Sequence, residues 1–341
     1  MAPSLRWMYT LSLQQRNTQA YSFGEGDEAM VNRLVGRDIL SVAELDKDEI
    51  SYVLDVAEEF EAAFWKGELR DLLANRIVVP LFYVEDPWLR ASFESAVCRL
   101  GGRLISNPGA AHGGPAPTGA ALAARARWAS VYGDLIVHRH AEVFSAHEAA
   151  KGAVVPVVNA GDGTYEDPCQ ALADLYTLRN ERGEIDGLSI SLVGDLKHSR
   201  FAHSLVRALS HWDVSIRLVS PPNLKMATVL TVPLKQAVSV VESPDIPSGL
   251  EHADAVYAAP IEETQLRRAS EAQGARDWLA SQIALLEETA PNVAVMCPTP
   301  QADWLDLTPA DPPASAAYGQ AVNGVWVRAA VVALILGALP L

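Results

Sequence analysis

The sequence contains few cysteines and comparatively few basic residues. Its three cysteines, Cys98, Cys169 and Cys297, include no pair at C-x-x-C spacing, so neither a disulfide framework nor a zinc site is predicted. The 27 lysines and arginines are outnumbered by 42 acids, which gives a net charge of −15. Because no basic stripe is present to displace counterions from phosphates, we expect no nucleic-acid partner. We expect no metal or cofactor, and the cysteine usage favours a reducing cytoplasm.

Long uninterrupted apolar runs are also missing. The N-terminus has no basic segment followed by an apolar one, so no signal peptide is predicted. The most apolar stretch, VWVRAAVVALILGALPL at 325–341, is interrupted by Arg328, and the run beyond it is too short to span a bilayer comfortably. We therefore expect a buried C-terminal helix and no membrane partner. With 49% apolar residues, the chain can bury a substantial core.

Apolar runs of strand length alternate with helical patterns along most of the chain. A first set (RIVVPLFYV, GRLIS, GDLIVHRH, VVPVVNAG) precedes a second (LSISLVGD, SIRLVS, ADAVYAAP, NVAVMCP). A helix capped by Ser41 is expected before the first set, another from Pro168 between the sets, and a loop at the Gly-, Pro- and Ala-rich 106–121. This alternation predicts an α/β fold, with two doubly wound parallel-sheet domains joined by helices.

Two acidic triplets, Glu85-Asp86-Pro87 and Glu166-Asp167-Pro168, each lie where a strand-like run gives way to a helix-like one. Aspartate followed by proline is a good helix start, with Asp as N-cap and Pro at the first helical position. Ligands of parallel sheets also collect beyond the carboxyl ends of the strands. Paired carboxylates there would supply a general acid, or hold an ammonium group or a divalent cation. The sequence does not decide whether Asp86 and Asp167 cap helices or bind a ligand.

Five phrases resemble the aspartate/ornithine carbamoyltransferase family, and its aspartate branch more closely: RASFESAVCRLGG, VPVVNAGDGTYEDPCQALADLYTL, SLVGDLKHSRFAHSL, VSPPNLKM and QAVNGVWVRAAVVALIL. The resemblance implies a carbamoyl-phosphate domain at 36–167, an amino-acid domain at 168–324, and a helix at 325–341 that packs back on the first domain. Residues 1–35 would be an N-terminal extension. The resemblance also implies a homotrimer and transfer in the cleft between the domains.

The segments that would hold carbamoyl phosphate depart from the family pattern. The family's S-T-R-T loop reads Asp86-Pro87-Trp88-Leu89 here, and the histidine of its H-P-T-Q motif is Asp167. The loop that lends a lysine to the neighbouring subunit corresponds to 106–121, which contains no lysine. Burying a phosphate dianion against Asp86 without a counter-charge would cost several kcal/mol. We therefore expect the carbamoyl-phosphate motifs to be lost.

Several other positions keep the family's residue, and others replace it. Arg139-His140 matches the family's Arg-His pair, Gln170 survives from H-P-T-Q, and Arg200 matches the arginine that holds the α-carboxylate. The second carboxylate arginine, in an R-x-Q motif, falls at Pro260, with Glu262 in place of the glutamine. The H-P-L-P loop reads CPTP at 297–300.

These observations predict a repurposed family enzyme of specialised biosynthesis, which acts by acid/base chemistry on a small amine that carries a carboxylate, without carbamoyl phosphate. The expected catalytic residues are Asp86, Asp167 and His198. The expected substrate-binding residues are Trp88, Arg139, His140, Gln170, Arg200, Glu262, Pro298 and Thr299. One alternative is an inactive paralogue that serves as a scaffold or regulatory chain. The other is residual aspartate carbamoyltransferase activity.

Overall fold

The computed structural model describes residues 32–105, 116–244, 253–289, 293–298 and 316–339. Their contacts divide the chain into two compact units, Met1–Cys169 with Val325–Leu341, and Gln170–Gly324. Two helices, α6 (Pro168–Arg182) and α11 (Ala316–Ile335), run from one unit into the other. Helix α6 starts at the predicted proline.

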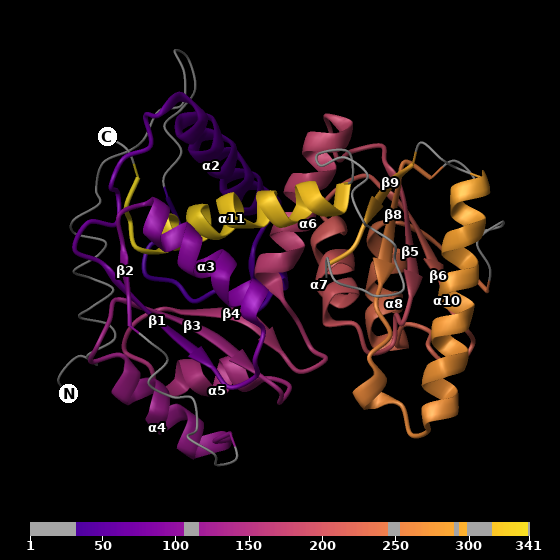
Figure 1. Ribbon diagram of the computed structural model, residues 1–341, viewed down its shortest axis with the longest axis horizontal. Coiled ribbons are helices and arrows are strands. Elements are labelled where there is room, and N and C mark those ends of the chain that lie inside the picture. Colours follow the sequence, from indigo (N-terminus) through magenta and orange to yellow (C-terminus); the bar gives the residue numbers. More distant parts are fainter. Residues whose placement is uncertain (1–31, 106–115, 245–252, 290–292, 299–315, 340–341) are drawn as a thin grey trace. The chain divides into compact units, whose positions relative to one another are not determined.

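The first unit contains a parallel sheet with strand order β2-β1-β3-β4 among the described residues. Its strands are β1 (Ile77–Phe82), β2 (Arg103–Leu104), β3 (Leu135–His140) and β4 (Val157–Asp162). Helices α4 (Gly119–Ala129) and α5 (Ser145–Gly152) cover one face, and α3 (Pro87–Arg99) lies on the other (Figure 1). The apolar residues of β1, β3, α4 and α5 form one buried cluster, which fixes these helices on the sheet.

The second unit contains a parallel sheet with strand order β7-β6-β5-β8-β9 among the described residues. Its strands are β5 (Ser189–Gly194), β6 (Ser215–Val219), β7 (Ser239–Ser243), β8 (Ala255–Ala259) and β9 (Ala294–Met296). Its helices are α7 (Arg200–Leu209), α8 (Thr228–Ala237) and α10 (Ala269–Thr289), with the short η2 (Glu263–Gln265) after β8. The predicted fold class, two parallel-sheet α/β domains, is confirmed.

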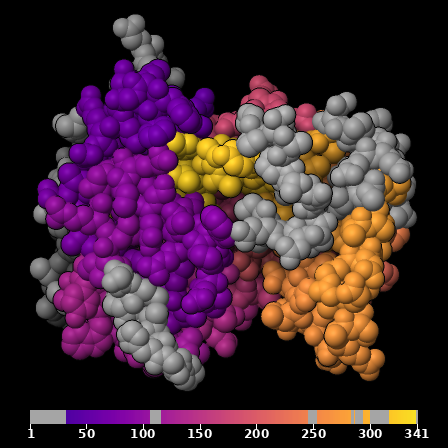
Figure 2. Space-filling view, in the orientation of Figure 1, coloured from indigo at the N-terminus to yellow at the C-terminus, as the bar shows by residue number. Residues whose placement is uncertain are grey.

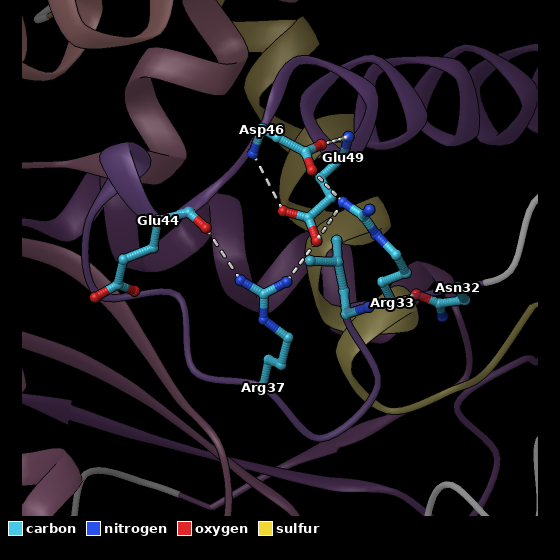
Figure 3. A network of polar contacts seen from close by, with 7 residues as sticks. Asn32, Arg33, Arg37, Glu44, Asp46 and Glu49 are labelled. Atoms are coloured by element: carbon cyan, nitrogen blue, oxygen red, sulfur yellow. Dashed lines mark hydrogen bonds and ion pairs between the residues drawn. The ribbon is translucent and has the colours of Figure 1, made fainter.

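The first long helix starts later than the sequence predicted. Ser41 caps a short 3-10 helix, η1 (Val42–Glu44), and α2 (Lys47–Lys66) follows. Asp46 is the true N-cap of α2 and forms a capping box with Glu49. Arg37 donates to Glu49 over 2.5 Å, and Arg33 pairs with both acids (Figure 3). The prediction of one helix from Ser41 was wrong because two caps lie close together.

Two further expectations need correction. Of the predicted loop 106–121, residues 106–115 lie outside the described part, and α4 already begins at Gly119. Strand β7 was not predicted. It is an edge strand in which only Ser243 is fully buried, so its sequence, SVVES, carries no long apolar run.

The C-terminal helix α11 is long and apolar enough to cross a membrane, but 72% of its apolar segment is buried inside the protein. Figure 2 shows the part of it that reaches the surface, in yellow. Its charged residue, Arg328, is itself buried and donates to Ser92 over 3.0 Å. The Arg328 guanidinium also lies over the ring of Phe93, and Trp326 contacts Phe64 of α2. These contacts hold residues from Val325 onward on α2 and α3, as expected of a buried helix.

Candidate functional site

Each sheet has one point where the chain reverses its direction of travel across the strands. In the first sheet this point lies between β1 and β3, and in the second between β5 and β8. Ligands of open parallel sheets bind beyond the carboxyl ends of the strands at such points. Asp86 follows β1 and Arg139 ends β3, whereas Asp195 follows β5 and Glu262 follows β8. We call these the β1/β3 group (Asp86, Trp88, Arg139) and the β5/β8 group (Asp195, His198, Arg200, Glu262).

In the β1/β3 group, Asp86 occupies the N-terminus of α3. Its carboxylate accepts from the backbone N–H of Leu89 over 3.1 Å, and Pro87 takes the first helical position. The other carboxylate oxygen lies 3.6 Å from Nη2 of Arg139, whose side chain is nearly buried. The negative charge of Asp86 therefore offsets both the positive N-terminus of α3 and the retained Arg139. The indole of Trp88 is 61% exposed, so it does not fill a buried pocket, and stacking on a ligand stays a prediction.

The second acidic triplet lies at the end of β4 and is buried. Glu166 accepts from the Ser41 hydroxyl over 2.5 Å and from the Val42 N–H over 3.0 Å, so it anchors η1. Asp167 is 1% exposed, directly before α6. Burial raises the pKa of the neighbouring Asp162 to about 7, although hydrogen bonds from Asn159 and the Glu166 N–H oppose this.

Two histidines on β3 point to the face of the sheet that α4 and α5 cover. The rings of His138 and His140 stack at 5.8 Å, as the H-x-H spacing requires. Burial, with smaller effects from His140 and Arg139, lowers the pKa of His138 to about 3, so this ring is neutral. His140 contacts the Pro117 carbonyl through Nε2 and accepts the Glu142 N–H at Nδ1. Both ring nitrogens of His140 thus serve the backbone, and its predicted substrate contact stays a prediction.

Cys169, the second residue of α6, is fully buried. Burial raises the pKa of its thiol to about 12, Asp167 raises it further, and Arg328 opposes both. A thiol in this environment is not a nucleophile at neutral pH. The charges of Asp167 and Arg328 thus act on this thiol in opposite directions.

In the β5/β8 group, Asp195 is fully buried at the end of β5. Its Oδ1 accepts from the N–H groups of Lys197 and His198, at 3.2 and 3.1 Å. Its Oδ2 lies 3.1 Å from Nδ1 of His198 and 3.3 Å from the N–H of Glu262. Gly194 permits this arrangement, because a Cβ there would lie 2.0 Å from the Ala259 carbonyl oxygen of β8.

Arg200 begins α7, and its guanidinium lies 3.8 Å from Oε1 of Glu262 and 4.0 Å above the ring centre of Phe201. Arg200 is 8% exposed, whereas the Glu262 side chain is 25% exposed. Asp195 therefore contacts a histidine and the backbone of an acid, and that acid in turn pairs with an arginine. The sequence predicted site roles for the other three residues but only a turn-shaping role for Asp195, for which the D-x-x-H spacing was the available signal.

Gln170 lies in a buried amide network. Its Nε2 donates to Asp174 over 2.8 Å, and Gln320 of α11 donates to the same oxygen over 2.6 Å. Gln320 in turn accepts the N–H of Cys297 over 2.8 Å. Pro298 is half-buried after β9, and Thr299 lies outside the described residues. In the described part of the chain, no group of three or more His, Cys, Asp or Glu residues is placed to hold a metal.

Comparison with known proteins gives matches over nearly the whole chain. Residues 37–180 match the family "Aspartate/ornithine carbamoyltransferase, carbamoyl-P binding domain", and residues 186–335 match "Aspartate/ornithine carbamoyltransferase, Asp/Orn binding domain". The aspartate carbamoyltransferase catalytic subunit of Thermoplasma acidophilum is 36% identical over 304 residues, which cover 89% of this chain and 99% of that protein.

Comparison with solved structures also finds proteins of this family. Aspartate transcarbamoylase from Trypanosoma cruzi, in complex with carbamoyl phosphate and aspartate, has a TM-score of 0.80 and 28% identity over 89% of this chain and 98% of its own. The catalytic subunit of M. jannaschii aspartate transcarbamoylase has a TM-score of 0.75 and 30% identity over 87% and 96% of the two chains. The chain therefore belongs to the aspartate/ornithine carbamoyltransferase family.

Proposed function

We propose that this chain binds a small amino acid or amino-acid derivative through the carboxylate contact of Arg200, and acts on it without carbamoyl phosphate. The observation that carries this proposal is the β1/β3 group. Asp86 occupies the N-terminus of α3 and pairs with Arg139 at 3.6 Å, where an anion would otherwise gain both interactions. Two unit charges 4 Å apart interact by about 4 kcal/mol at an effective dielectric of 20, so the charge of Asp86 offsets the attraction that Arg139 would offer to a phosphate.

The β5/β8 group supports the same proposal from the amino-acid side. Pro260 and Glu262 stand at the family's second carboxylate arginine and at the glutamine two residues later, so aspartate would lose a cation and meet an acid. Arg200, whose guanidinium lies 3.8 Å from Glu262, is retained at the position of the family's α-carboxylate arginine. We propose a ligand with one carboxylate and an amine, and acid/base roles for His198, Asp86 and Asp167. The homotrimer, the cytoplasmic location and the domain boundaries 36–167 and 168–324 belong to the same proposal.

Purified protein tests this proposal directly. We expect no carbamoyl aspartate from carbamoyl phosphate and aspartate at millimolar concentrations, and no calorimetric binding of inorganic phosphate. Turnover at a rate typical of enzymes would overturn the proposal. Asp167→Asn should abolish turnover of the true substrate, and an unchanged rate would remove Asp167 from the acid/base chemistry.

The second candidate function is aspartate carbamoyl transfer. It is favoured by the 36% identity with a catalytic subunit over almost its entire length. The same assay decides between the two, because formation of carbamoyl aspartate is the reaction of the second candidate alone.

A further inference from the structure

We propose that the Tyr83 hydroxyl and Nδ1 of His138 hold one buried water molecule between the ends of β1 and β3, on the face of the sheet that α4 and α5 cover. Neither residue belongs to the ligand contacts proposed above, so the inference does not depend on the proposed function. The water joins the two strands whose ends carry Asp86 and Arg139.

Three aromatic rings meet at this place. Tyr83 directly follows β1, its N–H donates to the Arg139 carbonyl over 2.9 Å, and its ring packs against the apolar cluster of β1, β3, α4 and α5. The centre of the Tyr83 ring lies 5.9 Å from that of His138 and 5.2 Å from that of His140, and both pairs are T-shaped. The three side chains therefore form one small polar cluster on a mainly apolar face.

The hydrogen bonds of this cluster are incomplete within the described part of the chain. Both ring nitrogens of His140 contact the backbone, and Nε2 of the fully buried His138 lies 3.2 Å from the Ser145 hydroxyl. Nδ1 of His138 and the Tyr83 hydroxyl are also buried, and no described residue forms a hydrogen bond with either atom. Buried polar groups are nearly always hydrogen-bonded, to protein or to ordered water, so both atoms require a further partner.

The electrostatics of the cluster favour a neutral partner. Burial, with smaller effects from His140 and Arg139, lowers the pKa of His138 to about 3, so positive charge is disfavoured here. Burial also raises the pKa of the Tyr83 phenol, with Arg125 opposing, so negative charge is disfavoured as well. Water is small and neutral, and it both donates and accepts. It therefore complements a hydroxyl and either tautomer of a neutral imidazole.

The sign of a stability change tests the inference. If water bridges the two groups, Tyr83→Phe removes a hydrogen bond and should lower the folding equilibrium constant about three- to tenfold, measured by urea titration of the full chain. A hydroxyl without any partner would give the opposite sign, because its removal relieves a desolvation cost, and that result would overturn the inference. Tyr132→Phe is the matched control and should leave the constant unchanged, since Tyr132 is 52% exposed.

A double-mutant cycle tests whether the two groups share one water. His138→Leu removes the other side of the bridge, so Tyr83→Phe should lose most of its effect in that background. An equal effect in both backgrounds would overturn the shared site. A high-resolution crystal structure of the wild-type protein gives an answer even if His138→Leu does not fold. We expect density for one water about 3 Å from both atoms. A direct hydrogen bond between Tyr83 and His138, a side chain of the protein in that place, or no density there would overturn the inference.

Discussion

The two strand-end groups use similar residues in different ways. In each, an acid of the chain lies within 4 Å of an arginine, Asp86 with Arg139 and Glu262 with Arg200. In the β1/β3 group the acid is also a helix cap, and the nearby His140 has both ring nitrogens on the backbone. In the β5/β8 group the buried Asp195 contacts Nδ1 of His198 over 3.1 Å and so orients the ring. The comparison indicates that Asp86 stabilises the start of a helix, whereas Asp195 contacts a histidine and three backbone N–H groups.

The largest expected effect is a pH dependence from Asp162, near the first group. Its folded pKa of about 7 lies above the ordinary 3.8, so the folded state binds more protons between these values. The free energy of unfolding therefore falls as pH rises through this window, by as much as about 4 kcal/mol at 1.36 kcal/mol per unit. Urea titrations at several pH values measure this. Asp162→Asn should flatten the dependence, and an equally steep curve for the variant would contradict it.

The second prediction compares how much Asp195 and Asp86 contribute to stability. Asp195→Ala removes a carboxylate that accepts four hydrogen bonds, three of them from backbone N–H groups. We expect a loss of about 3 kcal/mol in unfolding free energy, since each buried group left unsatisfied costs about 1–3 kcal/mol. Asp86→Ala is the matched control and should lose about 1 kcal/mol, the typical value of a cap. Equal losses of unfolding free energy in the two variants would show that Asp195 contributes no more to stability than Asp86.

The third effect concerns the repeated Glu-Asp-Pro triplet. Glu166→Ala should lower the unfolding free energy by about 2 kcal/mol, because the buried Val42 N–H and Ser41 hydroxyl lose their acceptor. The corresponding Glu85 is exposed, so Glu85→Ala should change stability by less than about 0.5 kcal/mol. Denaturant midpoints of the two variants compare them directly. A large loss for Glu85→Ala would show that the first triplet has a structural partner of its own.

These contrasts show what the sequence could predict. Eight strands followed from apolar runs, whereas β7 was missed because only Ser243 of its five residues is buried and its sequence carries no such run. Asp86 and Pro168 were recognisable as helix starts from local residue types alone. The partners of Glu166 lie more than 120 residues away, and the contact between Asp195 and the Glu262 N–H joins strands distant in sequence. Such contacts depend on strand order, which local patterns do not encode.

The smallest expected effect on stability tests whether the first group could still bind an anion. Asp86→Ser keeps a good N-cap oxygen for the Leu89 N–H but removes the charge beside Arg139, so unfolding free energy should change by less than about 0.5 kcal/mol. The Arg139 guanidinium, no longer offset by the acid 3.6 Å away, and the helix N-terminus should then bind inorganic phosphate about tenfold or more tightly than wild type, measured by calorimetry. Arg139→Gln combined with Asp86→Ser is the control and should lose the gain. If Asp86→Ser binds no more phosphate than wild type, the charge of Asp86 is not what excludes the anion, and the tryptophan and proline that follow it are the barrier instead.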